Sequence, residues 1–395
     1  MTRYPTQRLC GGSADVLTSE SSSPLLVTMG TFWYKKYDEL SVAVKERKSE
    51  YVARCKLLGA DPNDVFKEVF QELVARAVKE SNWQEGLRLS EGKTQAFATA
   101  AFQDQPDIRG LRLDTGRILA THRRNITRLV RDARSEEEIG AYNLSLAYFV
   151  LPLIASELQS RQTASLAKAL LEAYTALQKS PKMPPEADKA IKKGMQVVEE
   201  LKASQARAMS PLTENVATQG EQFSHLLSEE FSTLVNPMTA KYLHFLHRIT
   251  LAGLQPPSVC GRYRKTPVNV GLEDVYFPAP SLVPGLTKEY CEWFPSLLSN
   301  VTKYDPLLMA ARVSYRFVAI HPYGDGNGRV SRLLMNLVLW SFNHPPVYLK
   351  ADKKGRHRYG WALRKANRGN LEPLACLIAI SLEEIYSKLI STVRS

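Results

Sequence analysis

HPYGDGNGRVSR, residues 321–332, separates two apolar helical patterns with three glycines and an asparagine. The segment before it, 305–320, is apolar on nearly all sides, which predicts a central buried helix, and a second apolar helix is expected from Arg329. Glycines at such a junction let the backbone approach a ligand closely, and the first N–H groups of a helix lack partners within it. The loop therefore predicts an anion site at a helix N-terminus.

The charged side chains of this loop favour a polyphosphate ligand. Arg329 and Arg332 project from nearly the same side of the first turn, where two guanidiniums are unfavourable unless an anion neutralises them. Asp325 supplies a hard oxygen ligand that suits Mg²⁺ on phosphates, and His321 suits a general base acting on a hydroxyl. Taken singly, each residue also fits an ordinary turn or a structural contact. Their combination favours a functional site.

The rest of the chain has mostly helical patterns. In the segment 59–80, Asp61 is a good N-cap, Pro62 fits the first helical position, and apolar residues recur at helical spacing. Residues 255–285 are rich in Pro, Gly and β-branched residues, which predicts a small hairpin with extended runs at 268–270 and 275–277. Other helical patterns cover 116–134, 137–158, 162–179, 187–208, 220–234, 286–300, 305–320, 329–342, 356–368 and 371–391.

Composition and residue spacing argue against a nucleic-acid-binding module, a cysteine metal site and a membrane-spanning helix. The chain has 395 residues, 44% of them hydrophobic, and a net charge of +12 that is scattered along the sequence without a nucleic-acid module. Five widely spaced cysteines without a CxxC pair favour a reduced compartment and argue against a cysteine metal site. The longest apolar stretch, 139–155, is shorter than the ~20 residues of a spanning helix. A cytoplasmic location is expected, and organelle targeting by the Ser-rich N-terminus stays open.

The loop resembles the signature of the Fic family, HPF-x-[DE]-G-N-[GK]-R-x-x-R, with Tyr323 in place of the usual phenylalanine. The family's aromatic anchors the loop in the core, so the hydroxyl of Tyr323 would need a polar partner there. The resemblance implies a Fic fold, a helical bundle with a β-hairpin flap beside the active-site loop, and transfer of AMP from ATP to another protein. His321 would deprotonate the target Ser, Thr or Tyr hydroxyl, and Asp325 would hold Mg²⁺ on the α- and β-phosphates.

The resemblance also implies how the start of the second helix binds ATP. Asn327, together with the backbone of Gly326 and Gly328, would cradle the α-phosphate, while Arg329 and Arg332 would hold the β- and γ-phosphates. The kinase-like Doc branch of the family typically has a lysine at the position of Gly328. The glycine therefore favours nucleotidyl transfer over phosphoryl transfer.

Two further segments extend the resemblance on either side of the loop. GRYRKTPVNVG followed by VYFPAPSLVPGL is similar to the family's flap, so Val275, Tyr276 and Phe277 would form an edge on which a target segment adds as a strand. A buried connecting hairpin is the alternative. RYGWALRKANRGNLEPL resembles the family's adenine-side region, where Tyr359 and Asn367 would lie near the base.

SNWQEGLRLSEGKT, residues 81–94, resembles the family's inhibitory motif [ST]-x-x-x-E-[GN]. Ser81 and Glu85 are four residues apart, hence on one face of a helix. In family members with this helix before the core, the glutamate pairs with the second arginine of the loop, here Arg332, and displaces the γ-phosphate. The alternative is a capping box with Ser81 as N-cap and Gln84 at the third helical position, which leaves Glu85 solvated.

Four segments follow from these patterns. They are a partly disordered N-terminal leader at 1–60, a helical region with the inhibitory motif at 61–155, a helical insertion or linker at 156–235, and a Fic catalytic core at 236–395. The expected function is an autoinhibited protein adenylyltransferase that uses ATP and Mg²⁺. A protein de-AMPylase using the same site and a non-catalytic nucleotide-binding scaffold are the alternatives. The expected partners are ATP and a hydroxyl-bearing target protein, with a homodimer possible and neither nucleic acid nor membrane involved.

Overall fold

The computed structural model describes residues 37–103, 115–132, 134–152, 154–155, 196, 239–268, 276–298 and 305–393. These parts of the chain are mostly helical, as predicted, and residues 136–152 are helical as well. The named helices are α2 (Tyr37–Leu57), α3 (Pro62–Gln84), α4 (Glu91–Gln103), α5 (Thr115–Arg131), α10 (Ala240–Leu251), η2 (Pro280–Leu282), α11 (Val283–Leu298), α12 (Pro306–Ile320), α13 (Asn327–Ser341), α14 (Lys353–Asn367) and α15 (Glu372–Thr392).

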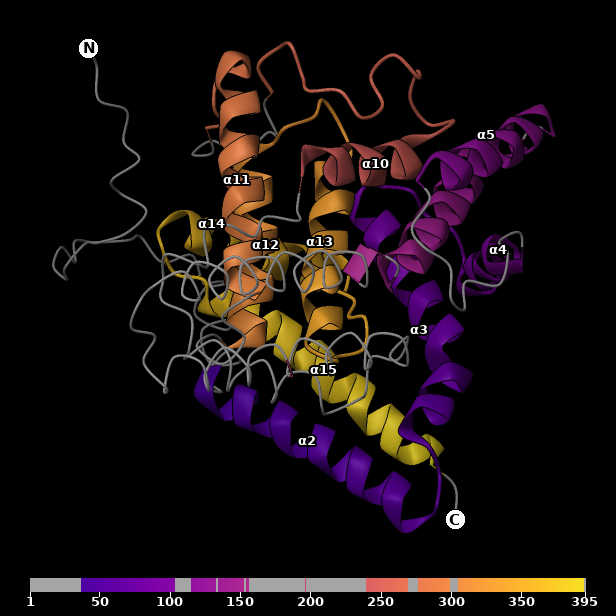
Figure 1. Ribbon diagram of the computed structural model, residues 1–395, viewed down its shortest axis with the longest axis vertical. Helices are drawn as coiled ribbons and strands as arrows, with labels where there is room; N and C mark the ends of the chain where they lie inside the picture. Colours follow the sequence, from indigo (N-terminus) through magenta and orange to yellow (C-terminus); the bar gives the residue numbers. More distant parts are fainter. Residues whose placement is uncertain are drawn as a thin grey trace, which may run out of the picture.

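Helices α12 and α13 lie side by side at the centre of the molecule (Figure 1). The Asp305 side chain caps α12 by accepting from the N–H groups of Leu307 and Leu308, and α12 ends at His321 in the left-handed conformation. Between the two helices, the hydroxyls of Ser314 and Ser331 hydrogen-bond at 2.8 Å. The predicted central helix is confirmed, and the 321–332 loop therefore lies at the end of a fully packed pair.

Helix α3 belongs to the same core as this central pair. Asp61 caps it by accepting from the Asn63 N–H, and Pro62 opens it, as predicted. Its buried face joins the core cluster that contains α12 and α13; these residues are Val65, Phe66, Val69, Leu73, Val74, Ala77 and Val78. The last turn of α3 thereby reaches the start of α13.

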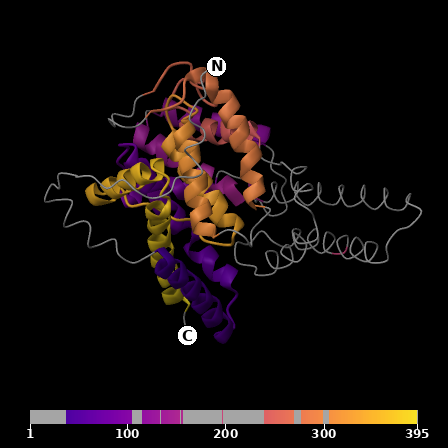
Figure 2. The ribbon, with the colours of Figure 1, turned by 90° about the vertical axis from the view of Figure 1, so that its left-hand side faces the viewer.

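Within the predicted leader, residues 37–57 form the helix α2. This helix lies beside α15 in both views (Figures 1 and 2). Tyr37 and Ser41 both donate to the carboxylate of Asp305, and the buried Tyr51 ring contacts that of Tyr386. The buried side chains of α2 alternate with many charged ones, so its apolar face could not be recognised from the sequence.

Several predictions fall outside the described residues. The 1–36 part of the leader, almost all of the 156–235 insertion and the 269–275 part of the hairpin are among them. In the described residues, β pairing is limited to a bridge between Ala252 and Gln255. The main core cluster contains buried residues of both 37–155 and 239–393, and a smaller second cluster consists of Ala101, Ile126, Leu129, Ile139 and Tyr142.

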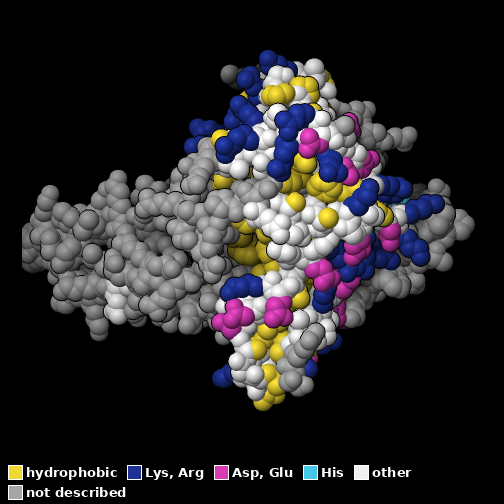
Figure 3. Space-filling model, turned by 90° about the vertical axis from the view of Figure 1, so that its right-hand side faces the viewer, with side chains coloured by type: hydrophobic (Ala, Val, Ile, Leu, Met, Phe, Trp, Pro, Cys, Tyr) yellow, Lys and Arg dark blue, Asp and Glu magenta, His cyan; other side chains and the backbone are white. Residues whose placement is uncertain are grey.

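Charged side chains of both signs lie among hydrophobic and uncharged ones on the face that α3, α4 and α5 present (Figure 3). Lys and Arg gather towards the upper end of this face, and α5 contributes the exposed Arg123, Arg124, Arg128 and Arg131. Within the described ranges, no helix combines the length and the apolar character needed to cross a membrane.

Candidate active site

The 321–332 loop is closed around Asn327. Its side-chain oxygen accepts from the Tyr323 N–H at 3.0 Å, and its amide nitrogen donates to the Tyr323 carbonyl at 2.8 Å. The ring of Tyr323 is fully buried, and its hydroxyl finds the expected polar partner in Nδ1 of His244, at 3.0 Å. The Asn327 side chain thus holds the loop together, and the phosphate contact expected at this position stays a prediction.

His321 has the geometry of a general base. Its Nδ1 lies 3.3 Å from the carbonyl of Val318, which can only accept, so Nδ1 carries the proton and Nε2 keeps a free lone pair. The ring of Phe277 covers the imidazole with a centroid separation of 4.2 Å. Burial lowers the pKa of His321, so the neutral imidazole predominates at neutral pH.

Arg264 connects the segment of the predicted flap to His321. This buried side chain donates from Nε to the His321 carbonyl at 2.7 Å and from a terminal nitrogen to the Pro278 carbonyl at 2.5 Å. A third contact reaches the Thr266 carbonyl at 3.2 Å. The sequence marked the segment around Arg264 as similar to a family motif, but nothing in the local pattern indicated that its side chain joins residues 266, 278 and 321.

Two glycines let neighbouring groups come close to the backbone at the start of α13. Gly326 has φ +74°, donates its N–H to Oδ1 of Asp325 at 2.6 Å, and packs so closely on Leu251 that an added Cβ would lie 3.1 Å from Cδ1. At Gly328 an added Cβ would lie only 2.5 Å from Oε1 of Glu85. The helix start is therefore open to a ligand or, in this structure, to the Glu85 carboxylate.

Arg329 carries unsatisfied donors at this helix start. Its side chain is 4% exposed, and neither Nε nor Nη1 has a hydrogen-bond partner. Its Nη2 lies 3.5 Å from Oδ2 of Asp325. Buried donors without partners are costly unless a ligand satisfies them, and at a helix N-terminus that ligand is an anion.

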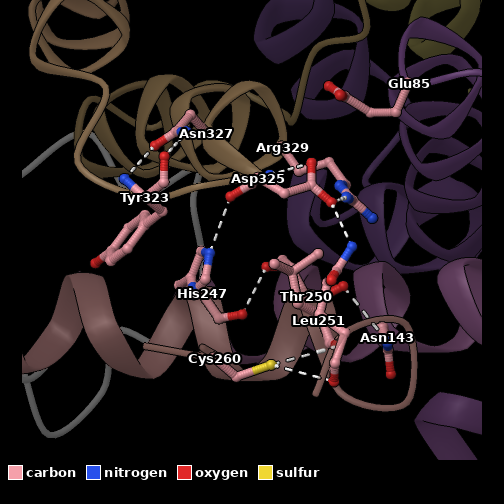
Figure 4. Close-up of polar contacts among 12 residues, drawn as sticks. Glu85, Asn143, His247, Thr250, Leu251, Cys260, Tyr323, Asp325, Asn327 and Arg329 are labelled. Atoms are coloured by element: carbon pink, nitrogen blue, oxygen red, sulfur yellow. Dashed lines mark hydrogen bonds and ion pairs between the residues drawn. The ribbon is translucent and has the colours of Figure 1, made fainter. Parts of the chain in front are cut away.

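Arg332 donates hydrogen bonds to the end of α3. It donates from Nε to Oγ of Ser81 at 2.7 Å and from Nη2 to the Ser81 carbonyl at 2.9 Å and to Oε1 of Glu85 at 2.6 Å. The predicted pairing of Glu85 with Arg332 is confirmed, and Figure 4 shows Glu85 approaching the loop from the α3 side. The capping-box alternative is wrong, because Ser81 lies in the last turn of α3 and Glu85 is its C-cap.

The adenine-side residues lie on α14. Tyr359 is buried beside Arg332, and burial raises the pKa of its hydroxyl. Asn367 accepts from the hydroxyl of Tyr315 at 2.7 Å. The structure thus places Tyr359 near Arg332, while the role of both residues at the adenine base stays a prediction. Of the flap residues, Val275 lies outside the described ranges and Tyr276 is 89% exposed.

Asp325 is suited to hold a magnesium ion only together with phosphates. Its side chain is 47% exposed, and its Oδ2 also accepts from Nε2 of Gln255 at 3.2 Å. In the described part of the chain, no group of three or more His, Cys, Asp or Glu side chains gathers into a protein-only metal site. Mg²⁺ commonly takes one or two carboxylates and completes its shell with phosphate oxygens and water, so this donor set fits the ion.

Comparison with known proteins agrees with the loop. Residues 237–339 match the model of the Fic/DOC family. A protein adenylyltransferase Fic of Aedes aegypti is 36% identical over 151 residues, which are 38% of this chain and 29% of that protein. One of Nematostella vectensis is 37% identical over 134 residues, 34% of this chain and 30% of that protein. The matches thus span less than a third of these relatives' length.

A solved structure shows that the likeness of fold extends beyond the matched segment. A Fic-domain-containing signaling protein from Bacteroides thetaiotaomicron aligns with a TM-score of 0.51 at 16% identity, over 89% of this chain and 96% of that chain. The helical architecture described above is therefore the Fic fold.

Proposed function

We propose that this chain, which carries a Fic domain at residues 237–339, is an autoinhibited protein adenylyltransferase that moves AMP from ATP to a hydroxyl side chain of a target protein. The observation that carries the proposal is the position of a neutral His321, with a free Nε2, at the far end of the same loop as the unsatisfied donors of Arg329. The names of the adenylyltransferase relatives support AMP as the transferred group.

The reaction needs a base and a preorganised anion site, and this chain's residues can supply both. Nε2 of His321 takes the proton of the target Ser, Thr or Tyr hydroxyl as its oxygen bonds to the α-phosphorus, and the bond to pyrophosphate breaks. The backbone N–H groups at the start of α13 and the guanidinium of Arg329 stabilise the charge on the phosphates. Asp325 would hold Mg²⁺, which supplies further neutralisation of phosphate charge when bound.

Inhibition follows from the site that Glu85 occupies. Its carboxylate pairs with Arg332 and lies against Gly328, at the helix start where the terminal phosphates of ATP would bind. A negative charge in that place competes for the arginine and repels phosphate. ATP would therefore bind weakly or in a pose whose α-phosphorus lies away from His321.

The donor can be identified by mass. Protein with Glu85→Gly is incubated separately with ATP, UTP, GTP and CDP-choline, and the intact mass is recorded after each. The proposal expects a mass gain of one AMP with ATP and smaller or no gain with the other donors. A gain with CDP-choline alone would replace nucleotidyl transfer by phosphocholine transfer.

A second candidate is removal of AMP from a modified protein. The Glu85 carboxylate lies at the phosphate-binding helix start and is 24% exposed, so it could accept a proton from a water molecule there. Wild-type protein and Glu85→Gly are incubated with an AMP-modified protein to compare the two directions. Release of AMP by the wild type alone would favour hydrolysis.

The pH dependence of transfer should reflect the lowered pKa of His321. A base must be neutral to act, and burial lowers its pKa below the ordinary value of about 6.5. As pH falls, transfer by Glu85→Gly protein should therefore decline with a midpoint below pH 6.5. Initial rates in buffers of constant ionic strength measure the profile, and a midpoint above the ordinary histidine range would contradict this role for His321.

A further inference from the structure

We propose that His247 is a positioning residue of this site, which fixes the peptide between Asp325 and Gly326 and thereby sets both the carboxylate and the helix start. The inference rests on the proposed function for its effect on catalysis, but its structural part stands on contacts of the described residues alone. None of these contacts involves a residue of the inhibitory motif.

Both ring nitrogens of His247 are committed. The side chain is almost completely buried on α10, and its Nδ1 accepts from the N–H of Gly261 at 2.7 Å. Nε2 must then carry the proton, and it donates to the Asp325 carbonyl at 3.0 Å (Figure 4). The ring also lies on that of Tyr323, with centroids 3.8 Å apart and planes 23° apart. The imidazole is therefore fixed in position, orientation and tautomer.

The carbonyl that His247 holds is at the point where the loop could most easily rotate. The next residue, Gly326, has φ +74° and no Cβ to restrict it. Its N–H belongs to the same peptide unit as the Asp325 carbonyl and donates to Oδ1 of Asp325. Rotation of this one peptide would therefore move the Asp325 carboxylate and the N-cap of α13 together.

A second contact, from the turn that follows α10, supports this assignment. Nε2 of Gln255 donates to Oδ2 of Asp325 at 3.2 Å, so the segment after α10 reaches the carboxylate while His247 reaches the carbonyl. The turn itself is fixed by the buried Asn143, which donates to the Ala252 carbonyl at 2.8 Å (Figure 4). Asp325 is thus held at two points by residues more than 60 positions earlier in the chain.

Three substitutions separate the two hydrogen bonds of His247. A glutamine places its amide nitrogen near the position of Nε2 and can still donate to Asp325, whereas an asparagine offers its oxygen near Nδ1 and keeps only the bond from Gly261. An alanine loses both. In the Glu85→Gly background, His247→Ala and His247→Asn should lower kcat about 10–100-fold, the usual effect of losing a residue that orients a ligand, and His247→Gln should lose less than about tenfold.

A readout independent of catalysis is amide hydrogen exchange of residues 321–332 without nucleotide. Exchange should rise in the alanine and asparagine variants and stay near the parent rate in the glutamine variant. His122→Gln is the matched control, because His122 is also buried and lies 3.2 Å from a carbonyl of α10, that of Ile249. It should leave both kcat and exchange of the loop unchanged.

The outcomes distinguish the two proposals. If the Glu85→Gly parent transfers AMP and all three His247 variants match it in rate and exchange, His247 has no positioning role. If glutamine fails as badly as alanine, the donor to Asp325 is not what matters, and the inference is wrong. If the parent shows no transfer, the proposed function fails, and the exchange data alone decide about His247. Should His247→Ala not fold, the asparagine and glutamine pair gives the same comparison.

Discussion

Glu85→Gly should raise the rate of AMP transfer from ATP by about 10–100-fold, because a hydrogen bond between charged groups contributes about 1.5–3 kcal/mol. The carboxylate that pairs with Arg332 at 2.6 Å disappears, and its place against Gly328 becomes free for phosphate. Arg332 keeps both bonds to Ser81, so the side chain stays in place. The measurement is incorporation of labelled AMP into the protein itself, checked by intact mass.

Glu85→Gly should also make the Tm of the protein respond more strongly to ATP than the Tm of the wild type does. In the wild type the buried Arg332 has an anionic partner, whereas in the variant only a bound phosphate can provide one. Tm should therefore rise more with ATP in the variant than in the wild type. Glu91→Gly is a suitable control, since Glu91 pairs with Lys79 at the surface and should affect neither property. Unchanged transfer and unchanged response to ATP in Glu85→Gly would reduce the contact with Arg332 to a structural ion pair.

His321→Ala should lower transfer by about 10²–10⁴-fold, the usual contribution of a general base, while ATP still binds. The test is made in the Glu85→Gly background, with transfer rate and the rise of Tm with ATP measured side by side. Because His321 has φ +50°, alanine also strains the backbone. His321→Asn avoids most of that strain, since asparagine adopts this conformation more readily.

Matched controls separate the base from the fold around it. His357 lies exposed on α14, and His357→Ala should transfer AMP like the parent. If His321→Asn retained a substantial fraction of the parent rate while binding ATP, deprotonation by His321 would not be part of the mechanism. Loss of ATP binding in both His321 variants would point instead to a collapsed loop.

The loop itself could be predicted from the sequence because its chemistry is local. Twelve consecutive residues contain the proposed base, the proposed metal ligand, the glycines and both arginines, so no knowledge of the fold was needed to group them. The unusual hydroxyl of Tyr323 even indicated that a polar partner should exist, and His244 is that partner. The pairing of Glu85 with Arg332 was accessible only through the resemblance to a family motif.

Residues whose roles depend on distant neighbours could not be predicted. Nothing near His247 in the sequence indicates that its ring lies beneath Tyr323 and reaches Asp325, and the same holds for Arg264 and the His321 carbonyl. The pattern SNWQ fits either the start or the end of a helix. What decides is the preceding apolar face of α3, which continues to Val78 and leaves Ser81 in the final turn.

The packing of α3 has a practical consequence for obtaining active protein. Its apolar face is part of the core that encloses α12 and α13, so Glu85, the residue proposed to inhibit the site, caps a helix that the fold requires. Deletion of residues 1–86 would remove Glu85 together with α3. The side chains of the central helices that pack against α3 would then be exposed to solvent. A shortened protein should therefore aggregate on expression, and single substitutions at Glu85 are the better way to test the proposed inhibition on folded protein.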